Sequence, residues 1–373
     1  MKKYVLKLLH KIGFVRLWCY LRKGRITIIT FHGVMDKGVE SEWKPLRPRM
    51  SRKDFDEALG LFKQYFNFVS MRQAVGMVNG DSPLIPNTCV VTFDDGHRNN
   101  ITCALPILKK HQIPVILYPS TQFVETGGPY WFDRLDYAIQ QPGLNGMTLD
   151  VGGTEIVVDQ TSKRAIAATL SRLIRQLKKI EQPDSEFRKL VESFTAQMEG
   201  VSGKSLRQLK PGDNWSAAMT WQQIRDCVLS GEVEIGSHTV NHVRLSHADE
   251  QTVSYELSES RATIEAKTDK PCTFFCFPNG DWCMKAVRIL KKTGYESAVT
   301  SDSGSNKVGD NPYLLKRFSV PNKGSALDAL FTTTGLFHFK SKFFKKLFLF
   351  HDQKKLHKGD SDRLSGKVTP KSS

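Results

Sequence analysis

Residues 89–96 read CVVTFDDG, a short apolar run that ends in two aspartates and a glycine. An apolar run of this length predicts a strand buried on both faces, as in a parallel sheet. Asp94 and Asp95 then lie at the carboxyl end of the strand, where parallel α/β folds place their functional sites. One of them could bind a cation while the other takes a proton, although Asp-Asp-Gly alone is more typical of an ordinary turn.

Similar apolar runs alternate with helical patterns on both sides of this stretch. Further strands are predicted at residues 26–31, 115–118, 233–235, 273–277, 297–300 and 315–320. Helices are predicted at residues 52–65, 101–111, 221–229, 254–267 and 285–293, with Pro106 kinking or beginning the second of them. Repeated strand–helix units with short connections indicate an α/β fold with a mostly parallel sheet, either a closed barrel or a doubly wound sheet.

Residues 125–215 interrupt this alternation. They contain an aromatic group at residues 130–132, then a β-like piece at 147–158 and polar helices at 163–180 and 185–200. We interpret them as a helical insertion, and such insertions often form lids or substrate walls. The chain is therefore divided into an N-terminal segment (1–25), a main domain (26–335) and a C-terminal tail (336–373) that is predicted to be disordered after residue 352.

The net charge of +16 is concentrated at the two ends of the chain. Residues 1–25 contain eight Lys or Arg and no acidic residue, and residues 337–373 contain ten Lys or Arg and three Asp. The main body is therefore nearly neutral, and because no nucleic-acid-binding motif accompanies the charge, no nucleic-acid partner is expected. The seven cysteines are scattered and odd in number, which argues against a disulfide framework and fits a cytoplasmic protein.

Both basic ends are also apolar. In residues 1–25 the apolar side chains recur at helical spacing with lysines off that line: Val5, Leu8, Leu9, Ile12, Val15 and Cys19. The interrupting charges argue against a signal peptide and a membrane-spanning helix. Residues 337–350 combine six Phe with four Lys. Such segments suit an anionic bilayer surface, so we expect peripheral contact with the inner face of the cell membrane; the alternative is packing against the barrel or a partner.

Two more polar clusters follow predicted strands. The first, SHTVNH at residues 237–242, places His238 and His242 four residues apart, on one face of a predicted helical turn, so that one ion can reach both imidazoles. The pair alone could be two solvated loop histidines, but an aspartate and two histidines form a hydrolytic metal set with open positions. The second, FPNGDW at residues 277–282, is by itself a turn whose backbone N–H groups could face an oxyanion.

The motifs TFDDG, SHTVNH and FPNG, in this order, resemble the first three motifs of the polysaccharide deacetylases, carbohydrate esterase family 4 with the NodB-homology domain. The resemblance spans roughly residues 26–335, around the insertion. It implies a distorted (β/α) barrel of about seven units and a divalent metal ion, with zinc favoured. It also implies residue roles: Asp95, His238 and His242 as metal ligands, Asp94 as general base, and the backbone of Asn279 in the oxyanion hole.

The sequence departs from the family pattern in two places. Many members carry an arginine before the third motif that holds the base aspartate, but residues 273–277 contain none, and Arg317 is the predicted substitute. The usual C-terminal motif with a catalytic-acid histidine is also missing. His32, at the end of the strand predicted at 26–31, resembles the acid of exopolysaccharide deacetylases and is assigned as general acid; the alternative is an ordinary loop histidine.

The implied reaction is hydrolysis of an N-acetyl group on an amino-sugar-containing polysaccharide or glycan. Asp94 would take a proton from water, and His32 would give one to the leaving amine. Two alternatives stay open. The same site could act on a lipid-linked sugar or another small amide at the membrane surface, for example by deformylation, or the protein could be a catalytically silent glycan-binding or scaffold protein.

Overall fold

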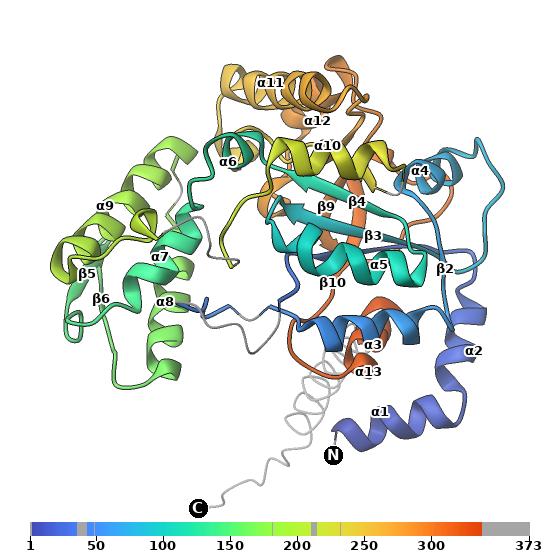
Figure 1. Cartoon of the computed structure of the whole chain (residues 1–373), viewed down its shortest axis with the longest axis horizontal. Helices are drawn as coiled ribbons and strands as arrows, with labels where there is room; N and C mark the ends of the chain where they lie inside the picture. The colour runs from blue at the N-terminus through green and yellow to red at the C-terminus, as the bar shows by residue number, and fades with distance from the viewer. Residues whose placement is uncertain are drawn as a thin grey trace, which may run out of the picture.

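The computed structural model describes residues 2–35, 43–47, 49–180, 182–209, 215–231 and 233–337, and its main body is a barrel of parallel strands (Figure 1). Around the barrel the order is β7 (Val233–Ile235), β4 (Val115–Pro119), β3 (Thr88–Asp95), β1 (Ile26–Phe31), β10 (Leu315–Ser319), β9 (Ser297–Ser303) and β8 (Phe274–Cys276). All neighbours are parallel, and a short strand, β2 (Asn67–Phe68), pairs with the start of β3.

The barrel closes between β7 and β8, just beyond the end of β7. The Ser237 N–H donates to the carbonyl oxygen of Phe274 at 2.9 Å, and the Cys276 N–H donates to the carbonyl oxygen of Ser237 at 2.9 Å. This nearly closed ring of parallel strands confirms the predicted distorted (β/α) barrel. It rules out the doubly wound sheet that the sequence had left open.

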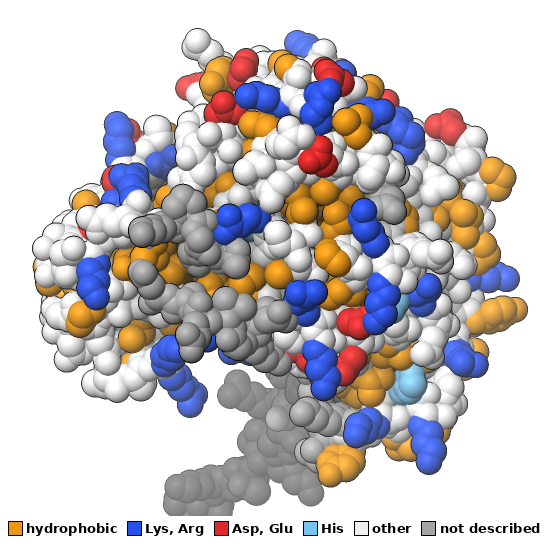
Figure 2. All heavy atoms as spheres, viewed as in Figure 1, with side chains coloured by type: hydrophobic (Ala, Val, Ile, Leu, Met, Phe, Trp, Pro, Cys, Tyr) orange, Lys and Arg blue, Asp and Glu red, His pale blue; other side chains and the backbone are white. Residues whose placement is uncertain are grey.

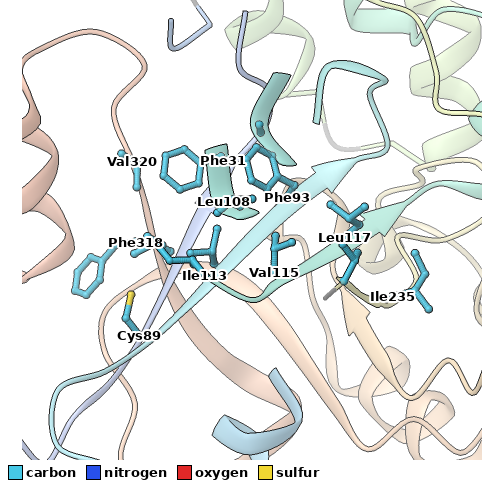
Figure 3. Close-up of a cluster of buried hydrophobic side chains, with 14 of the residues drawn as sticks. Phe31, Cys89, Phe93, Leu108, Ile113, Val115, Leu117, Ile235, Phe318 and Val320 are labelled. Carbon is cyan, nitrogen blue, oxygen red and sulfur yellow. The ribbon is translucent and has the colours of Figure 1, made fainter. Parts of the chain in front are cut away.

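The strands are apolar on both faces because each face packs against a different layer. Alternate residues such as Ile28, Val90 and Ile116 form one buried cluster inside the barrel with α4 (Met71–Asn79). Residues of the opposite parity, such as Phe31 and Phe93, pack in the outer layer (Figure 3). The helices of this layer are α3 (Arg52–Phe62), α5 (Leu105–His111), α10 (Trp221–Leu229), α11 (Glu250–Thr268), α12 (Met284–Lys292) and α13 (Ala326–Thr333).

The strands and helices predicted for the barrel are all present, with ends that differ by a few residues. The helix predicted at 101–111 starts with a π-helical turn, Asn100–Ala104, and α5 then begins at Leu105 with Pro106 in its first turn, as expected. Several short elements were not predicted: β2, α4, α6 (Thr121–Thr126) and α13.

The insertion forms a separate layer beside the barrel, at the end toward which the arrows of β3 and β4 point (Figure 1). It contains α7 (Trp131–Ile139), the hairpin of β5 (Thr148–Val151) and β6 (Thr154–Val157), and the helices α8 (Lys163–Leu177) and α9 (Asp184–Ser202). These elements bury a hydrophobic cluster of their own, which includes Leu135, Leu149, Leu173 and Phe194. The β-like piece and the two helices predicted for this region are present, next to the carboxyl ends of the barrel strands.

A buried carboxyl group, Asp136 in α7, ties the insertion to the segment at residues 43–47. It accepts hydrogen bonds from the Leu46 N–H at 3.1 Å and the Gln140 side chain at 2.7 Å. Burial raises its pKa from 3.8 to about 6. The folded protein therefore binds a proton here between about pH 4 and pH 6 that the unfolded chain has lost.

Asp136→Asn is expected to change how stability depends on pH. As pH falls through about 6 toward 4, the free energy of unfolding of the wild type should rise relative to that of the variant by about 3 kcal/mol, because protonation removes a buried charge. Urea unfolding of both proteins at a series of pH values measures this difference. Parallel pH curves for the two proteins would contradict the prediction.

The N-terminal segment forms two helices, α1 (Lys2–Lys11) and α2 (Phe14–Leu21), that pack against the barrel. Nowhere in the described ranges is a helix both long and apolar enough to cross a membrane. All seven cysteines are free thiols, as their odd number and scatter predicted. The predicted basic aromatic tail falls outside the described residues from residue 338 on.

Candidate functional site

The three predicted metal ligands converge at the carboxyl end of the barrel. Asp95 is the last residue of β3, and His238 and His242 follow β7. The Nε2 atoms of both histidines lie 3.6 Å from Oδ1 of Asp95, and all three side chains are buried. The fold therefore brings together, from two distant segments, the donor set that the sequence suggested.

The protonation of these side chains fits a bound cation. Nδ1 of His238 lies 2.8 Å from the carbonyl oxygen of Cys276, and because that oxygen only accepts, Nδ1 carries the proton and Nε2 faces Asp95 with its lone pair. Burial, and then the charge of His242, lowers the pKa of His238 to about 4, so this imidazole is neutral near pH 7. Burial opposes ionisation of Asp95, but contacts with His242 and His97 hold its pKa well below the usual value.

A carboxylate oxygen and a nitrogen lone pair repel each other unless a cation lies between them. Two ligand atoms that each lie about 2.0–2.2 Å from one ion are about 3.3 Å apart. The 3.6 Å separation between Asp95 and each histidine is close to this value. The donor atoms of Asp95, His238 and His242 could therefore hold a metal ion together.

The helical turn predicted at residues 237–242 is wrong. The segment is an irregular loop in which Thr239 and His242 have positive φ angles of 68° and 58°. This conformation is strained for a β-branched residue such as Thr239. The buried carboxylate of Glu256, in α11, holds the loop by accepting hydrogen bonds from two consecutive backbone N–H groups at 2.8 and 2.9 Å and from the Asn241 side chain. The two imidazoles meet because this loop is fixed, not because of helical spacing.

Glu256→Gln is therefore expected to weaken metal binding although Glu256 is no ligand. Removing an outer support of a metal site typically costs about 10–100-fold in affinity. Titration of the metal-loaded protein with a competing chelator measures the change. Glu259→Gln, the same substitution on the exposed side of the same helix, is the matched control and should leave the affinity unchanged. Equal affinities for the two variants would show that the loop does not depend on Glu256.

The arginine that many family members carry before the third motif is absent from residues 273–277, and Arg317 takes its place beside Asp94 in space. From β10, Arg317 makes a two-pronged contact with Asp94, with N–O distances of 2.7 and 2.9 Å. Its Nε donates to the Thr300 carbonyl oxygen, and its Nη1 also contacts the Thr92 hydroxyl. Burial would raise the pKa of Asp94, but the Arg317 charge and hydrogen bonds outweigh it and lower that pKa, so Asp94 is ionised. Both side chains are buried.

A second donor set shares His238. The thiol of Cys276 and the carboxylate of Asp94 also lie close enough to His238 to form a three-ligand group. Burial raises the pKa of the Cys276 thiol well above the usual value, and its Sγ lies 3.3 Å from a guanidinium nitrogen of Arg317. A neutral thiol beside a fixed cation is a poor metal ligand. The donor set with Asp95 is therefore the better one.

His32 and Asn279 lie at the same end of the barrel. His32 follows β1 and is half-buried; burial lowers its pKa, and the nearby charges of Asp95 and Asp94 partly oppose that shift. Asn279 lies in the turn Pro278–Gly280 after β8, with a positive φ of 56° and an exposed side chain. Only its backbone is therefore held in place, by a hydrogen bond from the Ser301 hydroxyl to its carbonyl oxygen at 3.2 Å.

Three residues around the site were missed at the sequence level. His97 is fully buried, and its Nε2 lies 3.5 Å from Oδ2 of Asp95. The Tyr130 hydroxyl donates to the carbonyl oxygen of Asp95 at 2.7 Å, and the rings of Tyr130 and Phe132 pack against His242. The signals were present, because His97 follows Asp-Asp-Gly directly and the aromatic group opens the insertion. The start of the insertion is therefore a wall of the site.

A cavity of about 680 Å³ lies next to this wall. Its lining includes Tyr130 and Trp131 from the start of the insertion, together with Arg98, Arg188 and Asn241. None of the seven predicted site residues is among the described residues that line it. Aromatic rings beside polar and cationic side chains are the usual lining of a ligand cleft.

The comparisons with known proteins agree with this geometry. The family model described as polysaccharide deacetylase matches residues 206–298, which include His238, His242 and Asn279. The poly-β-1,6-N-acetyl-D-glucosamine N-deacetylase of Escherichia coli is 30% identical over 98 residues, which are 26% of this chain and 14% of that protein. Over residues 206–298 the chain is therefore similar to the polysaccharide deacetylase family.

Other similar proteins carry the same description. YxkH of Bacillus subtilis, a candidate polysaccharide deacetylase, is 26% identical over 113 residues, which are 30% of this chain and 40% of that protein. The matched region thus covers less than half the length of these curated relatives. The solved structure of the Streptococcus pyogenes deacetylase PplD in complex with acetate has the same fold, with a TM-score of 0.54, 15% identity, and coverage of 83% of this chain and 98% of that one.

Proposed function

We propose that this protein is a polysaccharide deacetylase that hydrolyses N-acetyl groups on an amino-sugar-containing glycan, with a divalent metal ion held by Asp95, His238 and His242. The observation that carries the proposal is the neutral His238 imidazole, whose Nε2 lone pair faces the Asp95 carboxylate at 3.6 Å. Two nitrogen ligands and one oxygen ligand favour zinc in a hydrolytic site. A divalent cation bound there would supply a Lewis acid for the acetamide carbonyl and for water.

The residues of this chain then divide the remaining chemistry. Asp94, kept ionised by Arg317, takes the proton of the attacking water. The backbone N–H of Asn279 donates to the developing oxyanion. His32 gives a proton to the leaving amine; because burial keeps its pKa low in the free protein, it must gain that proton once substrate is bound. The products are acetate and a free amino sugar.

The experiment is a pair of measurements on the wild type and Asp95→Ala. We expect purified wild type to contain about one equivalent of zinc or a similar ion and to release acetate from N-acetylglucosamine oligomers, and the variant to do neither. A metal-free, inactive wild type that still binds these oligomers would instead support the catalytically silent glycan-binding alternative. Metal content without acetate release would place the substrate elsewhere, for example on a lipid-linked sugar or a formylated amide.

A further inference from the structure

The helices α1 and α2, with the short link between them, carry half of the exposed large hydrophobic side chains among the described residues. Of the fourteen large hydrophobic residues that are exposed, six lie within these two helices and a seventh, Ile12, lies in the link between them. They are Tyr4, Val5, Leu8, Ile12, Leu17, Tyr20 and Leu21, with exposed fractions from 44% to 79%. Soluble proteins rarely leave contiguous apolar side chains uncovered unless these contact a partner or a membrane.

This apolar surface is held in place by the opposite face of the same helices. Leu6, Val15 and Cys19 are buried against the barrel layer, and the indole N–H of Trp18 donates to the carbonyl oxygen of Thr334 at 2.8 Å. The apolar residues that the sequence placed on one helical line therefore have two different surroundings. Val15 and Cys19 hold the helices to the barrel, whereas Val5, Leu8 and Ile12 face outward.

Basic side chains border the exposed apolar residues. Lys7, Lys11, Arg16 and Lys23 are exposed, and no acidic residue occurs in residues 1–25. Lys/Arg and hydrophobic side chains intermingle at the lower right of Figure 2, over α1 and α2 as placed in Figure 1. A mixed basic and apolar helical surface is complementary to anionic lipid headgroups, which attract the charges while the acyl boundary takes the apolar side chains.

This surface and the candidate site lie at opposite ends of the barrel. α2 leads directly into the start of β1, so it lies at the amino end of the strands, whereas Asp95, His238 and His242 lie at the carboxyl end. The described residues end at Phe337, whose ring contacts that of Phe331 in α13. α1 also packs against α13, and Trp18 donates its hydrogen bond to Thr334 just after that helix.

We propose that the exposed face of α1 and α2 binds the surface of a bilayer that contains anionic lipid, with the helices lying in the headgroup region. This surface is separate from the candidate catalytic site, so its test does not depend on deacetylase activity.

The test is co-sedimentation of the full-length protein with vesicles of equal parts phosphatidylglycerol and phosphatidylcholine, compared with vesicles of phosphatidylcholine alone. We expect binding to the anionic vesicles, weakened by salt. A basic-patch variant (Lys7→Gln, Lys11→Gln, Arg16→Gln) should bind about 100-fold more weakly. An apolar-patch variant (Leu8→Ser, Ile12→Ser, Leu17→Ser) should also lose about 100-fold.

Matched controls carry the same changes on the opposite side of the molecule, where Figure 1 places α12. One replaces the exposed basic residues Arg288, Lys291 and Lys292 by Gln, and the other replaces the exposed apolar residues Leu229, Tyr255 and Met284 by Ser. Both should bind vesicles like the wild type, and thermal melts establish that all variants are folded. The proposal is overturned if the wild type does not bind anionic vesicles or binds both vesicle types equally. It is also overturned if the patch variants bind anionic vesicles as well as the control variants do. Binding only to vesicles that contain a protein partner would equally overturn it.

Discussion

Replacing Asp94 by Asn should lower kcat for acetate release by about 10²–10⁴-fold, the usual contribution of a general base. The amide keeps the size of the side chain and part of its contact with Arg317, but it cannot take a proton from water. Because proton transfer occurs in the transition state, KM should change little. Steady-state kinetics on N-acetylglucosamine oligomers measure both parameters.

The metal content of the same variant separates the two overlapping donor sets. If Asp95, His238 and His242 hold the ion, Asp94→Asn keeps its metal and loses activity, whereas Asp95→Ala loses both. If the ion instead lay between Asp94, His238 and Cys276, Asp94→Asn would lose its metal. Asp269→Asn, the same change at an exposed helix end, is the control and should behave as the wild type. Unchanged kcat in Asp94→Asn would refute its role as base.

Arg317→Met should have the largest effect on stability. The substitution leaves the buried Asp94 carboxylate without its cationic partner, and breaking a buried ion pair from one side costs about 3–5 kcal/mol of the free energy of unfolding. Urea unfolding followed by circular dichroism measures the loss. Arg288→Met, at an exposed position on α12, should change stability by less than about 0.5 kcal/mol.

The double variant Asp94→Asn/Arg317→Met tests whether the pair is the cause. Once the carboxylate is neutral, the missing guanidinium costs less, so the double variant should be more stable than the sum of the two single losses predicts. Strict additivity would mean that Arg317 stabilises the barrel only through its other contacts, with Thr300 and Thr92.

The sequence predicted the barrel well because its signals are local. The short apolar run 89–93 forms a strand that is buried on both faces of the sheet. The polar residues that follow this run therefore lie at the carboxyl end of the strand. The contact between Arg317 and Asp94 could be anticipated in the same way, because the resemblance called for a cation beside Asp94 and residues 273–277 contain no arginine. Both inferences needed only the type of residue and its place relative to a strand.

The remaining features depend on contacts between distant segments. Glu256 shapes the loop at 237–242 from another helix, and nothing in its local sequence marks it as different from Glu259. The helical turn assigned to His238 and His242 was wrong for the same reason, since spacing alone cannot show a left-handed backbone. α4 was missed because its apolar residues cap the barrel interior, a position that only the closed sheet creates.

The hydrogen bonds that close the barrel between β7 and β8 link the candidate site to local opening of the barrel. The barrel closes there through hydrogen bonds of the Ser237 N–H and carbonyl oxygen. The next residue, His238, is a candidate metal ligand, and its ring is hydrogen-bonded to the carbonyl oxygen of Cys276 on β8. An ion held by Asp95 and His238 would therefore stabilise the pairing of β7 with β8 and make its local opening less frequent. Deuterium uptake at the amides of Ser237 and Cys276 would report occupancy of the site without any substrate. The ion that we propose for catalysis would then also stabilise the closed barrel.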